Sequence, residues 1–179
     1  MITRSRKGVT LQIYEGSIVD CYTDAVVIPT TATLDWDPEV GQELLKKAGP
    51  TAIARARRKI PLDIGEAVVT PSGGMLACFI VHVALPAGVQ AASIETRREL
   101  FETIIRNSVL RCAELGVPSV GLPNLGRWFG FSLKDSAQLL FTALDRAILD
   151  GGSVNEIHLV LENNAEITAF ADAGREDPV

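Results

Sequence analysis

Apolar and polar residues follow two different spacings along this chain, and the change from one to the other predicts where strands give way to helices. Residues 9–18 alternate with a period of two, as in a strand with one buried face. Five further short runs rich in apolar residues predict strands, some of them buried on both faces. These runs cover residues 24–29, 65–70, 79–84, 119–122 and 156–161.

Helical spacing of apolar residues fills most of the gaps between these strands. Pro38 at the start and Gly49 after the end predict a helix over residues 38–47, because proline favours the first helical turn and glycine the position after the last. Further helices are predicted over residues 51–59, 94–115, 132–149 and 164–174, with Ser132 as an N-cap. Strands that alternate with helices predict a three-layer α/β/α fold with a central mixed sheet of about six strands. They also predict a ligand crevice at the C-terminal ends of the strands.

Composition narrows the class of protein. The 179 residues are 47% hydrophobic and 22% charged, which is typical of one folded domain rather than a disordered chain. The net charge of −5 argues against general binding to nucleic acid, which requires a basic surface. No apolar run approaches the length needed to span a membrane, and the N-terminus lacks the apolar segment of a secretory signal. We therefore expect a cytoplasmic protein without a membrane or nucleic-acid partner.

Cysteine and histidine are too few and too scattered to predict a metal centre. The three cysteines are widely spaced, none stands in a CxxC pair, and there are two histidines. We expect no metal, no cofactor and no disulfide framework. Cys78 and Cys112 lie in apolar segments, where a buried and unreactive thiol is the usual state. His82 and His158 lie within predicted strands, which favours a structural, hydrogen-bonded role over catalysis.

The segment from Gly116 to Phe141 carries the clearest chemistry. A short apolar strand leads into a loop, residues 123–130, with glycines at positions 126 and 130, and helical spacing begins directly afterwards. Glycine lets the backbone approach a ligand closely, while the first turn of a helix has unpaired N–H groups and a dipole that favours negative charge. Arg127 adds a positive charge to the same loop. The loop is therefore a candidate phosphate site, although many glycine loops only close a strand–helix connection.

Taken in order along the chain, these blocks resemble the macrodomain, the family of ADP-ribose-binding modules. The resemblance is carried by residues 9–24, 24–31, 65–86 and 120–132, and residues 65–86 (GEAVVTPSGGMLACFIVHVALP) match most closely. It implies a macrodomain-like domain over residues 9–174, with an N-terminal extension over residues 1–8 and a C-terminal tail over residues 175–179. It also implies a partner, ADP-ribose or a related nucleotide derivative, held in the crevice.

The resemblance further implies which residues contact the ligand. Seven of them lie in the candidate phosphate loop, and the others lie at or after the ends of the first two strands or at the start of the first helix. The implied ligand-binding residues are Ser17, Ile18, Asp20, Thr31, Val40, Asn124, Leu125, Gly126, Arg127, Trp128, Phe129 and Gly130. Within this set, Phe129 stands where the family places an aromatic side chain against the distal ribose.

Several positions depart from the family pattern. Ser17 stands where the family has an aspartate for the adenine amino group, and a neutral hydroxyl accepts that hydrogen bond more weakly. Ile28 and Thr31 stand where two asparagines surround the distal ribose. Residues 36–40 (WDPEV) replace a run of glycines, and a proline with two carboxylates opposes a diphosphate there. The departures indicate a crevice that is reshaped for a different ligand or partly closed at the distal-ribose end.

Asp37, Glu39 and Thr31 are the candidate catalytic residues. Asp37 or Glu39 could activate a water molecule as a general base, but both also suit a helix N-terminus, with Asp37 as the N-cap before Pro38. Asp20 either replaces the missing adenine-binding aspartate or accepts a hydrogen bond within a turn.

Two functions remain compatible with the sequence. The first is a macrodomain that binds ADP-ribose, with or without hydrolysis of ADP-ribosyl or O-acetyl-ADP-ribose esters. In the family such hydrolysis depends on positioning substrate and water rather than on a nucleophile. The second is a divergent macrodomain without ADP-ribose activity that binds another nucleotide-like ligand or a protein. The sequence also leaves the roles of Trp36 and Trp128 undecided, because each could fill the core, stack on a base or block the crevice.

Overall fold

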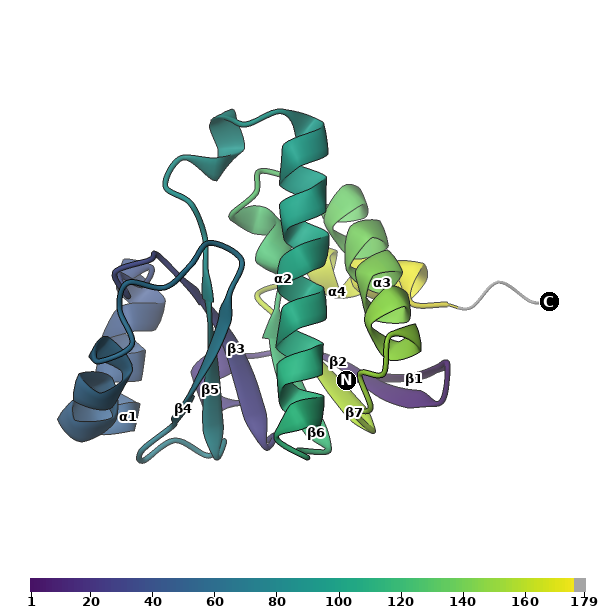
Figure 1. The fold of residues 1–179 in the computed structure, drawn as a ribbon. Helices are drawn as coiled ribbons and strands as arrows, with labels where there is room; N and C mark the ends of the chain where they lie inside the picture. Colours follow the sequence, from purple (N-terminus) through teal and green to yellow (C-terminus); the bar gives the residue numbers. More distant parts are fainter. Residues whose placement is uncertain (176–179) are drawn as a thin grey trace.

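The computed structural model describes residues 1–175, which form one mixed sheet of seven strands (Figure 1). The strands are β1 (Ile2–Arg6), β2 (Val9–Glu15), β3 (Ala25–Thr30), β4 (Ala67–Pro71), β5 (Phe79–Ala84), β6 (Ser119–Pro123) and β7 (Glu156–Leu161). Their order across the sheet is β1-β2-β7-β6-β3-β5-β4. The five inner strands run parallel, while β1 and β4 pair antiparallel at the two edges. The parallel strands therefore present their C-terminal ends along one side of the sheet.

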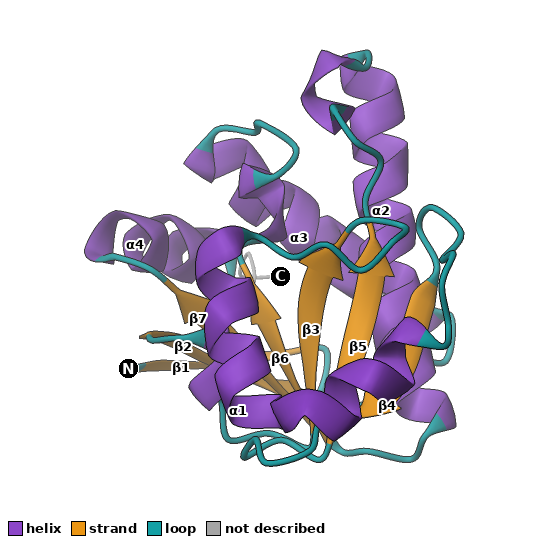
Figure 2. Cartoon of the chain, turned by 90° about the vertical axis from the view of Figure 1, so that its left-hand side faces the viewer, coloured by secondary structure: helices purple, strands orange, loops and turns teal. Residues whose placement is uncertain are grey.

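Helices cover both faces of this sheet (Figure 2). α1 (Pro38–Arg57) lies on one face, and α2 (Ile94–Glu114), α3 (Leu133–Leu149) and α4 (Asn164–Ala173) lie on the other. Single 3-10 turns follow three of the strands: η1 (Ile18–Asp20), η2 (Val89–Ala91) and η3 (Leu125–Arg127). None of the described helices is long and apolar enough to cross a bilayer. The predicted three-layer α/β/α fold with a mixed sheet is confirmed, with seven strands where about six were expected.

The position of β3 explains its unbroken apolar sequence. Ala25 and Val27 belong to the core beneath α2 and α3, whereas Val26 and Ile28 belong to the core beneath α1, and all four are fully buried. A central strand of a parallel sheet is covered on both faces, so it cannot show polar alternation. β2 lies one strand from the edge and keeps the alternation that the sequence shows, with only every second residue fully buried.

The N-terminal residues contribute an edge strand to the sheet. β1 pairs with β2 from Ile2 opposite Ile13 to Arg6 opposite Val9, so part of the predicted extension over residues 1–8 belongs to the folded body. Arg6 is anchored by a two-point ion pair with Asp145 of α3, with both N–O distances at 2.8 Å. β1 is absent from the predicted strands because its residues are mostly polar or charged. Of the predicted tail, residues 176–179 lie outside the described residues.

Two local predictions need comment. The predicted break after the first helix is present inside α1, where Gly49 has a φ of 79° and Pro50 follows it. The expectation that Cys78 is buried is wrong: its side chain is exposed, because β5 begins one residue later, at Phe79. Cys112, on α2, is buried as expected.

Candidate functional site

Two neighbouring cavities open where the parallel strands end. The first cavity, of about 600 Å³, lies over the ends of β2, β3, β6 and β7. The second cavity, of about 570 Å³, lies over the ends of β3 and β5. Pro29 and Trp128 line both, so they mark the boundary between the two. Together the two cavities form one crevice at the position that the strand order predicts.

Most of the residues predicted to bind a ligand do lie in this crevice. The first cavity is lined by Ser17, Ile18, Glu39, Val40, Asn124, Arg127 and Trp128, among others, and the second by Thr31, Asp37 and again Trp128. Asp20, Leu125, Gly126, Phe129 and Gly130 are not among the lining residues of either cavity. Asp20 instead forms an ion pair with Lys47 of α1, which favours a local role over an adenine contact.

The candidate phosphate loop is held by packing and by its own hydrogen bonds. Phe129 is fully buried and its ring stacks on Phe131, with 5.6 Å between the centroids. A Cβ atom at Gly126 would lie 2.6 Å from the Cβ of Ser136 on α3, so the close approach of loop and helix requires glycine here. The amides of residues 127–130 donate to carbonyls three residues earlier, at 3.1 to 3.4 Å. These four N–H groups are therefore engaged within the loop.

Asn124 is the buried polar residue of the loop and lines the first cavity. It is 4% exposed, and its Nδ2 donates to Oε1 of Glu166 at 2.7 Å. Oε2 of Glu166 accepts from the amide of Glu162 at 2.8 Å, so the carboxylate is fixed from both sides. Oδ1 of Asn124 is buried and has no hydrogen-bond partner among the described residues. Because buried acceptors are normally paired, a ligand hydroxyl or amino group would satisfy this oxygen if the packing over it opened.

The first cavity carries more negative than positive charge. Its charged lining residues are Glu15, Glu39, Glu43, Glu162 and Arg127. Arg127 forms an ion pair with Glu162, and its guanidinium lies over the ring of Trp128 with Cζ 4.6 Å from the centroid. A phosphate group would therefore compete with Glu162 for the one guanidinium in the lining, while the other carboxylates repel it.

A carboxylate reaches the position where the family resemblance implies an adenine-binding aspartate. Oγ of Ser17 donates to Oε2 of Glu43 at 2.9 Å, which connects the end of β2 with α1. Glu43 is not among the predicted site residues, because it lies 26 residues further along the chain than Ser17. The one signal that could have indicated it is its spacing from Glu39, since residues four apart share one face of a helix.

The loop that borders the second cavity is organised by its own side chains. Oγ1 of Thr31 donates to Oδ2 of Asp35 at 3.0 Å and accepts from the amide of Asp35 at 3.0 Å. Hydrogen bonds from Thr33 and Thr31 lower the pKa of Asp35, so its carboxylate stays charged. Oδ1 of Asp37 accepts from the amide of Glu39 at 3.1 Å, which confirms the capping role considered for Asp37.

Trp36 is both a core residue and a wall of the second cavity. Its ring centroid lies 6.1 Å from that of His82, and a Cβ atom at Gly41 would lie only 3.2 Å from the Cβ of Trp36. Burial lowers the pKa of His82 to about 4, so its ring is neutral, and Nε2 hydrogen-bonds to Oγ1 of Thr70 at 2.9 Å. His82 therefore has the structural role that its place in a strand predicts.

The polar side chains of the described residues are not grouped as in a metal site. Within residues 1–175, no group of three or more histidine, cysteine, aspartate or glutamate side chains is arranged to hold a metal ion. The polar groups that line the crevice are carboxylates, hydroxyls, amides and a guanidinium. Such groups suit an organic ligand that carries hydroxyl and amino groups.

Known proteins share this architecture. A family model described as the macro domain matches residues 27–140. The macro domain-containing protein SCO6450 of Streptomyces coelicolor is 28% identical over 174 residues, which cover 92% of this chain and 96% of that protein. The uncharacterized protein PAE1111 of Pyrobaculum aerophilum is 25% identical over 170 residues, which cover 92% of this chain and 91% of that protein.

Solved structures agree with the sequence relatives. An Oceanobacillus iheyensis macrodomain with ADP has a TM-score of 0.83 at 19% identity, with 96% of this chain and 93% of that chain covered. A Trypanosoma brucei macrodomain in complex with ADP-ribose has a TM-score of 0.78 at 16% identity, with 90% of this chain and 68% of that chain covered. At such identities the likeness shows a shared fold.

Proposed function

The chain belongs to the macro domain family, and on that premise we propose that its crevice binds ADP-ribose or a related nucleotide derivative. One observation carries the proposal: segments far apart in the sequence meet in the first cavity. They contribute residues 15–18, residues 39, 40, 42 and 43, residues 123, 124, 127 and 128, and residues 160 and 162, together with Pro29 of β3. These segments include the positions at which the family resemblance implies contacts with the adenine and the diphosphate.

Three polar groups of the first cavity support recognition of a nucleotide. The carboxylate of Glu43 can accept a hydrogen bond from an adenine amino group, with the charge assistance that Ser17 alone lacks. Oδ1 of Asn124 can accept from a ribose hydroxyl, which pairs an otherwise unpaired buried acceptor. Arg127 can meet the diphosphate once its guanidinium turns away from Glu162.

We expect any hydrolysis of ADP-ribosyl or O-acetyl-ADP-ribose esters to be weak. In a positioning mechanism the distal ribose must be held tightly. Ile28 is fully buried and has no polar group to offer, and the hydroxyl of Thr31 is engaged by Asp35. Each lost hydrogen bond to the substrate costs about 1 kcal/mol, which is several-fold in rate when it is lost in the transition state.

Calorimetric titration with ADP-ribose tests the proposal, with Val40→Trp as the blocking variant. Val40 lines the first cavity near the start of α1, so an indole there occupies space that the ligand needs. Leu45→Trp is the matched control, because Leu45 is an exposed residue of the same helix outside the cavity lining. We expect the wild type and Leu45→Trp to bind equally and Val40→Trp to bind at least about tenfold more weakly. Equal binding by both variants would place the site elsewhere.

The charge of the first cavity favours a second candidate function. A macrodomain without ADP-ribose activity could bind another nucleotide-like ligand or a protein partner, because four carboxylates repel a dianion more than a neutral molecule. Titration with adenosine beside ADP-ribose separates the two candidates. If ADP-ribose binds more tightly than adenosine, the first candidate is supported. If adenosine binds and ADP-ribose does not, the second is supported.

A further inference from the structure

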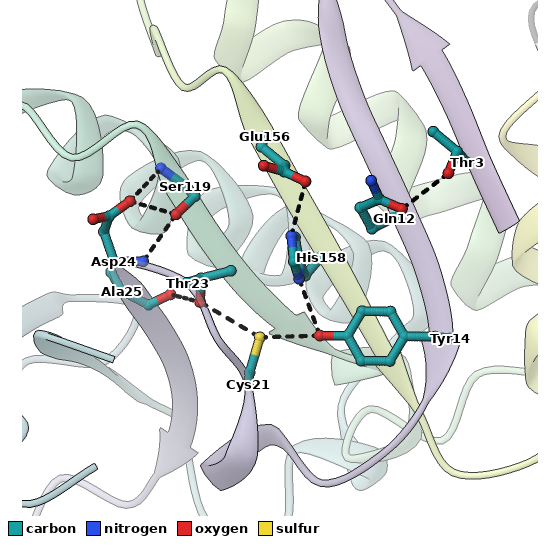
Figure 3. A network of polar contacts seen from close by, with 10 residues as sticks. All are labelled: Thr3, Gln12, Tyr14, Cys21, Thr23, Asp24, Ala25, Ser119, Glu156 and His158. Carbon is teal, nitrogen blue, oxygen red and sulfur yellow. Dashed lines mark hydrogen bonds and ion pairs between the residues drawn. The ribbon is translucent and has the colours of Figure 1, made fainter. Parts of the chain in front are cut away.

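A second polar cluster lies outside the crevice lining, on the sheet face that carries α1 (Figure 3). It joins Tyr14 of β2, Cys21 directly after η1, and Glu156 and His158 of β7. The parallel pairing of β2 with β7 brings these strands side by side, with Gln12 opposite His158. From its place in a predicted strand, His158 is expected to be structural, and the sequence predicts no role for Cys21.

The four side chains form a continuous hydrogen-bonded chain. Nε2 of His158 lies 3.0 Å from Oε1 of Glu156, and Nδ1 of His158 lies 3.0 Å from the hydroxyl of Tyr14. That hydroxyl lies 3.3 Å from Sγ of Cys21. Figure 3 shows the groups in this order, with Tyr14 between the imidazole and the sulfur. The distances allow one proton to be passed along each link.

The donors and acceptors of this chain define two consistent states. A carboxylate only accepts, so Nε2 of His158 donates to Glu156, and Nδ1 can then accept from Tyr14 while Tyr14 accepts from the thiol of Cys21. If each proton moves one link, the thiol becomes a thiolate and the imidazole an imidazolium. Every hydrogen bond is kept in that state, because Tyr14 now donates to the sulfur and Nδ1 donates to Tyr14.

The surroundings of Cys21 stabilise its thiolate relative to that of an ordinary thiol. Burial raises the pKa of the Cys21 thiol, but its interactions with His158, Thr23 and Tyr14 outweigh burial, so the pKa lies below its ordinary value. Cys21 also raises the pKa of His158, against the effect of burial and with help from Glu156. Cys112 shows the opposite behaviour, because burial alone raises the pKa of its thiol to about 12. The polar chain therefore distinguishes Cys21 from the other buried cysteine.

We propose that Cys21 is a site of oxidation by hydrogen peroxide, with Tyr14, His158 and Glu156 as the relay that removes the thiol proton. The thiolate sulfur attacks one peroxide oxygen, so that an S–O bond forms and the O–O bond breaks. Sulfur loses two electrons and the peroxide gains them. The hydroxide that leaves takes the proton held by His158, delivered through Tyr14, and departs as water. The net change is from a thiol and hydrogen peroxide to a sulfenic acid and water.

The packing around Cys21 excludes bulky reagents, and hydrogen peroxide reaches the sulfur through a local opening of the structure. Cys21 is 2% exposed, and a Cβ atom at Gly121 of β6 would lie only 2.7 Å from its sulfur. A reagent close to the size of water can reach such an atom far more readily than a bulky alkylating agent. The amide of Cys21 donates to the carbonyl of Ile18 at 3.3 Å, so the backbone of Cys21 is held against η1, whose first residue lines the first cavity.

The experiment uses the Cys78→Ser protein, from which the exposed thiol has been removed. The protein is treated with hydrogen peroxide over a range of pH, and the product is followed by intact mass and by peptide mapping after unfolding. We expect the gain of one oxygen at Cys21 before any at Cys112. Iodoacetamide should modify Cys21 more slowly, relative to an unfolded control, than hydrogen peroxide does.

Variants of the relay give the decisive readout. Tyr14→Phe removes the hydroxyl that connects His158 to the sulfur, and we expect the oxidation rate at neutral pH to fall by at least about tenfold. The rate of this variant should then rise with pH toward a midpoint above about 8.5, the value for a free thiol, because burial raises the pKa of the thiol and the hydroxyl no longer opposes it. Tyr22→Phe is the matched control, because Tyr22 is exposed beside Cys21 in the chain and its change should leave the rate unaltered.

His158→Gln removes the imidazole that accepts the proton from Tyr14. This second variant tests the proposal even if Tyr14→Phe does not fold. A slower, more pH-dependent oxidation in either relay variant supports the proposal. An unchanged rate and pH profile in both, or oxidation of Cys112 as fast as that of Cys21, overturns it.

Discussion

The two ends of the crevice are held in place by different forces. At the first cavity, the loop over residues 123–130 is fixed by the core, through Phe129 and through the contact of Gly126 with α3. At the second cavity, Leu34 and Trp36 also pack against the core, but Thr31, Asp35 and Asp37 are held by local hydrogen bonds and by the cap of α1. A wall fixed by the core changes at a high cost in stability, whereas a wall fixed by local hydrogen bonds can change with little effect on the fold.

The same two ends differ in what they offer a ligand. The first cavity provides the unpaired Oδ1 of Asn124 and the guanidinium of Arg127. The second provides two tryptophans and two carboxylates, Asp35 and Asp37, with no basic side chain among its described lining residues. Carboxylates outnumber basic groups in both cavities, but among the described lining residues only the first has a guanidinium, so we expect a diphosphate to bind there, through Arg127, rather than in the second.

Gly126→Val should show the largest effect, on stability. A side chain at this position overlaps Ser136 of α3, so the loop or the helix has to move, and we expect the free energy of unfolding to fall by about 3 kcal/mol. Gly16→Ala is the control at the same cavity, because the nearest atom to its new Cβ lies at 3.5 Å, an ordinary contact. Urea unfolding measures both variants. A stable Gly126→Val protein would mean that the core does not fix this loop.

The pH dependence of stability tests the core beneath the second cavity. The pKa of His82 is about 4 in the folded protein and about 6.5 when unfolded, so below pH 6.5 the unfolded chain binds a proton that the folded chain does not. Stability should therefore fall as the pH falls, by about 2 kcal/mol between pH 7.5 and pH 5 from this group. Urea unfolding of the wild type and of His82→Gln measures the difference. Equal slopes against pH in the two proteins would show that His82 is not neutral in its buried site.

Charge removal compares the two ends directly. Glu39 lines the first cavity and Asp37 the second, so Glu39→Gln and Asp37→Asn each remove one carboxylate from one end. If the diphosphate lies in the first cavity, Glu39→Gln should tighten ADP-ribose binding by about threefold at low salt and Asp37→Asn by less. Asparagine can still cap a helix, so α1 should keep its start in the second variant. A larger gain from Asp37→Asn would move the diphosphate to the second cavity.

The sequence predicted the framework well because the framework depends on local patterns. Apolar runs predicted the inner strands, and the helix break predicted at Gly49 is present. Ser132 is the N-cap that its position predicts, because its hydroxyl oxygen accepts a hydrogen bond from the amide of Asp135 at 3.1 Å. β1 was not predicted because this edge strand has polar residues on both faces and therefore lacks an apolar pattern.

The lining of the crevice was harder to predict, since it depends on which distant residues meet. Glu43 and Glu166 act through Ser17 and Asn124, which lie far from them in the chain. Phe129 was predicted to face a ligand, but the ring cluster with Phe131 places it in the core. Residue type suggested each side chain's chemistry, while its direction followed from packing that the sequence does not display.

Thr31→Asn should show the smallest effect, on turnover. The amide would supply the ribose contact that the family resemblance implies, but it must replace a hydroxyl that already pairs with Asp35. The gain is therefore limited, and we expect hydrolysis of O-acetyl-ADP-ribose to rise by only about twofold. Thr33→Asn is the matched control, because Thr33 also hydrogen-bonds to Asp35 but is not among the lining residues of the second cavity. Single-turnover assays compare the two variants with the wild type. An equal rise in rate in both variants would assign the effect to the loop rather than to a ribose contact. The two ends of the crevice would then differ less in ligand recognition than their side chains suggest.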